Sequence, residues 1–176
     1  MQGFWIQAIG FLALCIYLIS YQFKSNRWLF LFQMMGAMLF ALQYALIGGA
    51  SGALSQVIKV VRSLILLKYA DWPWVRTKGP MLFFCLLYLI ATIYTWTGAL
   101  SLIVLIASVV STLVFWTNNA RTIRIACLVF ICPCWLIYAI FTGSLGGILN
   151  ECFTIVSILI SIYRFGWKAL GEPQHT

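Results

Sequence analysis

The chain has 176 residues, of which 64% are hydrophobic and only 8% are charged, and its formal net charge is +8. A domain of this size cannot bury so much apolar surface in water, so the composition excludes a soluble protein. Because the basic residues stand mostly between apolar runs, the positive charge indicates membrane topology rather than a nucleic-acid partner.

Apolar runs of roughly 20 residues, the length that a helix needs to cross a bilayer, follow one another along the chain. The first run is predicted to be a helix rather than a removable signal peptide, because it lacks a basic leader and a small-residue cleavage site. The predicted helices cover 3–22, 28–47, 50–69, 80–97, 99–117, 122–142 and 145–165.

Basic residues fall in alternate connections between these helices or at the helix ends beside them, and at and after the end of the last helix. They are Lys24, Arg27, Lys68, Arg76, Lys78, Arg121, Arg124, Arg164 and Lys168. Since basic loops stay in the cytoplasm, we predict a periplasmic N-terminus and a cytoplasmic C-terminus. Two further cations, Lys59 and Arg62, lie inside the third predicted helix.

Two similar segments, YALIGGASGALSQ at 44–56 and YAIFTGSLGGILN at 138–150, indicate an internal repeat. A shift of 94 residues aligns 27–70 with 121–164 without a gap. We predict a first three-helix bundle over 1–69, a hinge loop and linker helix over 70–97, a second bundle over 98–166 and a cytoplasmic tail over 167–176. The linker helix restores the direction of the chain, so both bundles cross the membrane in the same sense.

Side-chain amides occupy equivalent positions in the third and seventh helices, at Gln56 and Asn150. We predict that they face each other across a polar cavity and bind a solute, with Tyr44, Trp135 and Tyr138 as further lining residues. Helix-to-helix contacts without a solute are an equally open interpretation of the amides, and core packing is one for the aromatic residues. Pro133, in the middle of the sixth helix, is predicted to kink it.

Glu151 is the one acidic residue inside the predicted spans. An unpaired charge in the bilayer costs several kcal/mol, so we expect an ion pair between Glu151 and Lys59, with Arg62 as the rival partner. Two cations against one anion leave positive charge in excess, which favours an anion or a link to protons over a purely structural contact. Helix association alone is the competing interpretation.

Catalytic and metal-binding patterns are not found. The sequence has a single histidine, His175, and its cysteines do not form a CxxC pair. No Ser-His-Asp set, paired carboxylates or phosphate-binding loop is present. We therefore expect neither an enzyme, a cofactor nor a bound metal.

A family resemblance rests on residues spread over most of the chain. They are Gly52, the run 62–65, Arg121, the run 135–138, the run 143–147, Glu151 and the pair 164–165. This pattern resembles bacterial inner-membrane proteins of the YgjV type, and Arg62 and Glu151 match it. The resemblance implies a location in the bacterial cytoplasmic membrane and brings no substrate. The layout of three, one and three helices is also similar to SWEET and PQ-loop transporters, although no Pro-Gln dipeptide lies in the spans. This resemblance implies that Pro133 is a hinge.

These observations lead to a prediction of function. We expect a small-solute transporter with a polar cavity between the third and seventh helices, opened alternately to either side. Its partners would be membrane lipid, a small polar or anionic solute and a second copy of the chain. The alternative is an integral membrane protein that does not transport and serves as a scaffold or partner of another complex.

Overall fold

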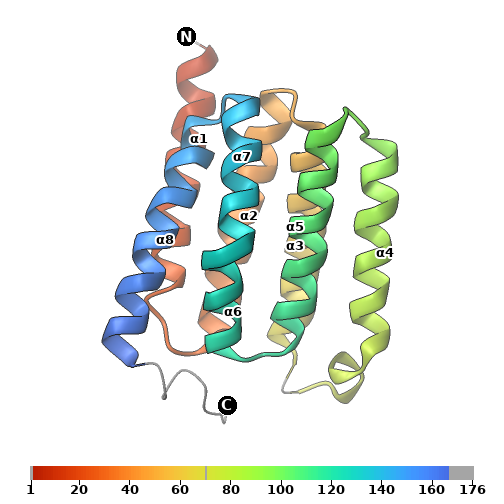
Figure 1. Ribbon diagram of the computed structural model, residues 1–176, viewed down its shortest axis with the longest axis vertical. Helices are drawn as coiled ribbons and strands as arrows, with labels where there is room; N and C mark the ends of the chain where they lie inside the picture. Colours follow the sequence, from red (N-terminus) through yellow and green to blue (C-terminus); the bar gives the residue numbers. More distant parts are fainter. Residues whose placement is uncertain (1, 70, 167–176) are drawn as a thin grey trace.

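The computed structural model describes residues 2–69 and 71–166, and these form nearly parallel helices (Figure 1). The helices are α1 (Gln2–Ser20), α2 (Asn26–Leu46), α3 (Ala50–Leu67), α4 (Lys78–Tyr94), α5 (Ala99–Trp116), α6 (Ala120–Ala126), α7 (Cys132–Thr142) and α8 (Leu145–Phe165). A short 3-10 helix, η1 (Pro73–Arg76), precedes α4, and a π-helical turn, η2 (Cys127–Ile131), joins α6 to α7. The predicted tail at 167–176 lies outside the described residues.

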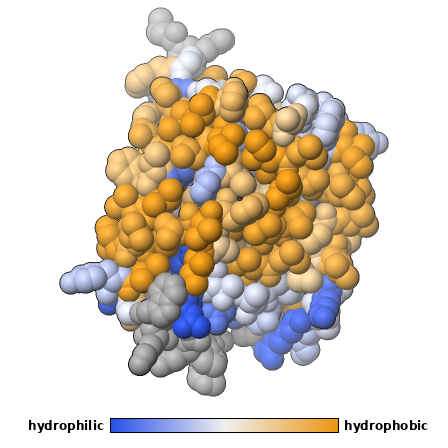
Figure 2. Space-filling model, in the orientation of Figure 1, coloured by the Kyte–Doolittle hydropathy of each residue, from blue (hydrophilic) through white to orange (hydrophobic). Residues whose placement is uncertain are grey.

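The described residues provide 6 helices that are long and apolar enough to cross a membrane, with α6, η2 and α7 counted as one span of 23 residues. The shorter apolar helix α4 has 17 residues. Apolar side chains cover the outside, and Figure 2 shows a broad hydrophobic band across the visible face. An all-helical membrane protein is thereby confirmed.

The helices form two layers. One contains α1, α2 and α3, and the other contains α8, the α6–α7 span and α5, with α4 beside them (Figure 1). Within each layer the middle helix packs on both neighbours, so each triplet is a row rather than a compact bundle. The layers meet where α1 packs on α8 and where α3 packs on α5, and these contacts close a ring of helices. Helix α4 packs on α5 and α3 from outside this ring.

The two triplets cross the bundle in the same sense, because α1 and α5 begin at the same end of the molecule (Figure 1). This agrees with the direction expected for two triplets joined by one linker helix. The internal repeat itself stays a prediction.

Glycine ends the second helix of each row, where the chain must reverse direction sharply. Gly48 and Gly143 have positive φ angles of 80° and 70°, which other residues adopt only with strain. After Gly143, the Ser144 hydroxyl accepts a hydrogen bond from the Gly147 amide at 3.0 Å and thereby caps α8. These turns bring the starts of α3 and α8 to the same end of the ring.

The connection between α3 and α4 is tied to α5 by one tryptophan. Trp116 is buried, and its indole N–H donates to the Val75 carbonyl oxygen at 2.7 Å. Val75, in the short 3-10 helix η1 between α3 and α4, is fully buried. The predicted hinge segment is therefore anchored to the second half of the chain.

Candidate functional site

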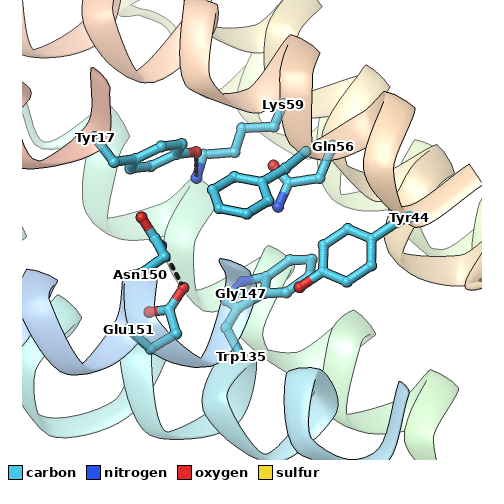
Figure 3. A pocket seen from close by; sticks show the side chains of 9 residues that line it. Tyr17, Tyr44, Gln56, Lys59, Trp135, Gly147, Asn150 and Glu151 are labelled. Atoms are coloured by element: carbon cyan, nitrogen blue, oxygen red, sulfur yellow. Dashed lines mark hydrogen bonds between the residues drawn. The ribbon is translucent and has the colours of Figure 1, made fainter. Parts of the chain in front are cut away.

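Two small cavities lie inside the ring, each with a volume of about 20 Å³, room for about one water molecule. The first is lined by Tyr17, Phe40, Tyr44, Gln56, Lys59, Trp135, Gly147, Asn150 and Glu151 (Figure 3). The second shares Tyr17, Lys59, Trp135, Asn150 and Glu151 with the first, and adds Tyr21, Gln33, Ser111, Phe115, Cys127, Ile131, Cys132 and Thr154. The shared residues show that the cavities are adjacent.

Gln56 on α3 and Asn150 on α8 both line the first cavity and are 5% and 4% exposed. Both face the interior, as the helical periodicity predicts. The Asn150 amide donates to Glu151 Oε1 at 2.9 Å. Within the described chain, Gln56 Oε1 and Asn150 Oδ1 are buried without a hydrogen-bond partner. Two amide oxygens therefore remain able to accept a hydrogen bond inside the ring.

The expected ion pair between Glu151 and a cation is not formed. Lys59 instead donates to the Tyr17 hydroxyl at 2.6 Å, and its Nζ lies 4.8 Å from the centroid of the Tyr17 ring. Figure 3 shows Lys59 and Glu151 on different sides of the cavity, with Glu151 beside Asn150. Tyr17 belongs to α1. The prediction from sequence compared only the helices now seen as α3 and α8, and therefore did not consider Tyr17. The prediction of a direct contact between Lys59 and Glu151 is therefore wrong.

Arg62 is directed toward α5 rather than toward Glu151. Its Nη1 donates to Thr112 Oγ1 at 2.7 Å and its Nη2 donates to Ser111 Oγ at 3.0 Å. The guanidinium also lies 5.1 Å from the Phe115 ring centroid, and the residue is 1% exposed. Hydroxyl groups and an aromatic face thus replace the carboxylate partner that the sequence led us to expect.

The three predicted aromatic residues form one cluster. Ring centroids are 5.4 Å apart for Tyr44 and Tyr138, 5.8 Å for Trp135 and Tyr138, and 6.2 Å for Tyr44 and Trp135. Tyr44 and Trp135 line the first cavity. The Tyr138 hydroxyl instead accepts from the Gly52 amide at 2.9 Å and joins the start of α3 to α7.

Pro133 follows the π-helical turn η2 by two residues. Proline lacks an amide hydrogen and its ring crowds the carbonyl one turn back, which explains a widened turn at this place. Cys127 and Ile131, the first and last residues of the turn, line the second cavity. The hinge role of Pro133 stays a prediction.

Several interior polar residues did not enter the predicted site. Gln33 is 1% exposed and lines the second cavity, and in the part of the chain described here neither of its amide atoms has a hydrogen-bond partner. Gln43 is fully buried and accepts from Ser144 Oγ at 3.1 Å. The sequence contains a signal that could have identified them, because both glutamines interrupt the apolar run of the second helix.

Arg124 is counted in the sequence analysis among the basic residues that set the topology, but it is fully buried in α6. Its Nε donates to Ser161 Oγ at 2.9 Å, and its Nη2 donates to the Phe23 carbonyl oxygen at 3.1 Å. Arg124 therefore joins α8 to the segment that follows α1. Arg62 makes the corresponding link at the other junction, between α3 and α5.

Residues 4–169 match the family described as Imp-YgjV, bacterial inner membrane protein. The chain belongs to this family. Membership and the apolar helices together establish a multi-pass protein of the bacterial inner membrane. Neither the curated proteins nor the solved structures contain a match to the chain. Among the described residues, no group of three or more His, Cys, Asp or Glu side chains is arranged to hold a metal ion.

Proposed function

We propose that the protein carries small polar or anionic solutes across the bacterial inner membrane, with the space between α3 and α8 as the binding site. One observation supports this proposal above the others. An acid, a cation and unpaired amide oxygens gather around cavities that a ring of apolar helices encloses. Ionisable groups inside a membrane are expensive and commonly mark the path of a solute or a proton.

The unpaired amide oxygens favour an occupant over a purely structural network. A buried polar atom without a partner costs about 1–3 kcal/mol. Gln56 Oε1, Asn150 Oδ1 and both Gln33 amide atoms are in this state in the described part of the chain. Since all three residues line the cavities, a solute with hydrogen-bond donors, or water bound together with an anion, would supply the hydrogen bonds that the protein itself does not.

Hydrogen bonds close the ring at both ends, which fits an occluded state of a carrier. At the end where α3 and α8 begin, the Tyr138 hydroxyl accepts a hydrogen bond from the Gly52 amide, and the Ser144 hydroxyl donates one to Gln43. At the other end, Arg124 holds the Phe23 carbonyl, and Gln22 donates to Ser157 at 2.9 Å. Breaking one set at a time, as the triplets rock against each other, would open the cavities to alternate sides.

The test is a search for transport with purified protein reconstituted into liposomes. Solute-driven currents on a solid-supported membrane would be recorded over a library of small polar and anionic solutes, for the wild type and for Glu151→Gln. We expect at least one solute to produce a current that Glu151→Gln alters. The exposed acid Asp71 provides the matched control, Asp71→Asn, which should leave the current unchanged.

Equal signals from wild type, Glu151→Gln and protein-free liposomes for every solute would contradict the proposal. Such a result would support the alternative of a non-transporting scaffold or partner protein. The small volume of the cavities, about 20 Å³ each, is the observation that favours this alternative.

A further inference from the structure

The interior of the ring has more positive than negative charge. Lys59 lines the second cavity, and Arg62 lies behind it, hydrogen-bonded to the lining residue Ser111. Glu151 is the one acidic residue in the described helices. Of the two other acidic residues, Asp71 lies in the loop after α3 and Glu172 lies outside the described residues. An uncompensated cation in a low-dielectric interior is costly, so a bound anion would stabilise this arrangement.

Hydrogen-bond donors converge on the second cavity from three helices. Lys59 of α3 uses one of its three N–H groups on Tyr17 and keeps two. Ser111 of α5 accepts from Arg62, so its own hydroxyl hydrogen is available, and the residue lines the cavity. Gln33 of α2 adds an amide nitrogen that is buried without a partner among the described residues.

We propose that the second cavity binds a small inorganic monovalent anion such as chloride, held by Lys59, Ser111 and Gln33. This assignment rests on the transport function proposed above and names its substrate class. Arg62 is a positioning residue, because it orients Ser111 and adds positive charge behind it without lining the cavity. A volume of about 20 Å³ is on the scale of a single water molecule or small ion, and it excludes sugars and amino acids from this conformation.

Glu151 also lines the second cavity, and its negative charge opposes the anion. The carboxylate is held by Asn150 on α8, whereas the three donors belong to α2, α3 and α5. The proposal therefore predicts opposite effects on anion binding for substitutions of Lys59 and Glu151, the two charged residues that line this cavity. Removing the charge of Lys59 weakens anion binding, and removing the charge of Glu151 strengthens it. A cavity that holds only water would show neither effect.

The test is calorimetric titration of the full chain in detergent with sodium chloride, against sodium gluconate at the same ionic strength. We expect saturable chloride binding, weakened by about tenfold or more in Lys59→Met and in Ser111→Ala, because each loses a hydrogen bond to a charged group. Glu151→Gln should bind more tightly than the wild type. Lys68→Met removes an exposed lysine and should bind as the wild type does.

Absence of saturable chloride binding to the wild type would overturn the proposal, as would wild-type affinity in a folded Lys59→Met. If Lys59→Met does not fold, Ser111→Ala decides, because this change removes only a hydroxyl. Chloride efflux from liposomes separates this inference from the proposed function. Binding without efflux leaves the anion site standing and contradicts transport of chloride. Transport of another solute without chloride binding contradicts the anion site and leaves the carrier standing.

Discussion

Single polar residues inside the ring differ greatly in how well they are satisfied. Arg62 donates from both terminal nitrogens to hydroxyl groups on α5 and leaves only its Nε without a partner, whereas both amide atoms of Gln33 lie buried without a partner among the described residues. In lipid, interhelical hydrogen bonds contribute on average less than 1 kcal/mol, but a buried charge that loses its acceptor is costly. The satisfied residues therefore maintain the ring, and the unsatisfied ones mark where an occupant can bind.

Thr112→Val tests the contribution of the acceptor for Arg62. Thr112 accepts from Arg62 and donates to the Ser108 carbonyl oxygen at 2.8 Å. We expect a loss of about 1–2 kcal/mol in the free energy of unfolding, because one N–H of a buried guanidinium is left unpaired. The measurement is reversible unfolding in mixed detergent and SDS micelles.

Thr92→Val is the matched control for this change. Thr92 is also buried, and its hydroxyl likewise donates to a carbonyl one turn back, that of Tyr88, at 2.8 Å. Both variants lose this local bond, and only Thr112→Val loses the contact with Arg62. Equal losses in the two variants would show that the bond from Arg62 to Thr112 contributes nothing to stability.

The inward direction of Gln56 and Asn150 could be predicted from the sequence, because helical periodicity fixes which residues share a face. The partner of Lys59 could not. A lysine side chain reaches in several directions, and the hydroxyl that it contacts belongs to Tyr17 on a different helix. Arg62 shows the same limit, since the hydroxyl groups of α5 compete with Glu151 for it.

At the scale of helices, α1 and α8 approach each other closely at two glycines. A methyl group added at Gly146 would lie 2.6 Å from the Cα atom of Gly10. Because the obstacle is backbone rather than a flexible side chain, the two helices must separate to accommodate it. This contact is one of the two junctions between the layers.

Gly146→Ala should therefore destabilise the protein by about 1–3 kcal/mol, the usual range for overpacking. Gly79→Ala is the control, because an added methyl group there would meet only the Thr77 hydroxyl at 3.7 Å. Unfolding in mixed micelles measures both variants. A Gly146→Ala protein as stable as Gly79→Ala would refute the close approach of α1 and α8.

The bond from Trp116 to Val75 predicts how the loop before α4 behaves. Trp116→Phe keeps an aromatic ring but removes the N–H that holds the Val75 carbonyl. We expect faster cleavage by trypsin after Arg76 or Lys78, because local opening of the loop then costs about 1 kcal/mol less. Trp74→Phe, at a tryptophan that is 49% exposed, serves as the control and should leave the cleavage rate unchanged.

Helix positions followed from the apolar runs, so that the second helix was predicted over 28–47 and is observed over Asn26–Leu46. The order of the helices around the ring could not be predicted from these apolar runs. The lipid-facing surface of every span is apolar, so the composition of a span does not indicate which other helices it contacts. The π-helical turn was also unpredictable, since one surplus residue changes neither composition nor length appreciably. Helix α2 has no such turn, so a gap-free alignment of the two halves does not preserve helical phase beyond it.

At the scale of the whole molecule, polarity is distributed in the reverse of the soluble pattern. Apolar side chains form the outer band, and charged residues gather toward one end, where α8 also ends (Figure 2). Amides, hydroxyls and three of the cations, Lys59, Arg62 and Arg124, lie within the ring instead. This arrangement fits a protein whose function lies inside it rather than on a loop.

The basic end of the molecule should face the cytoplasm, because positively charged loops are retained there. We expect green fluorescent protein fused after the last residue to fluoresce, and alkaline phosphatase fused there to be inactive. Phosphatase fused after Thr97, in the connection between α4 and α5, should be active. The reverse pattern at the two positions would show that the chain is inserted in the opposite orientation.

The turn at Cys127–Ile131 also has a consequence for insertions and deletions. Deleting one residue from a transmembrane helix normally rotates all later residues of that helix by roughly 100° about its axis, so that side chains that were buried face lipid. A π-helical turn already accommodates one residue more than an α-helical turn would, and the segments on either side are aligned around that surplus. We therefore expect shortening the chain by one residue within 127–131 to leave Trp135 and Tyr138 pointing inward, whereas the same deletion within α2 would scramble its faces.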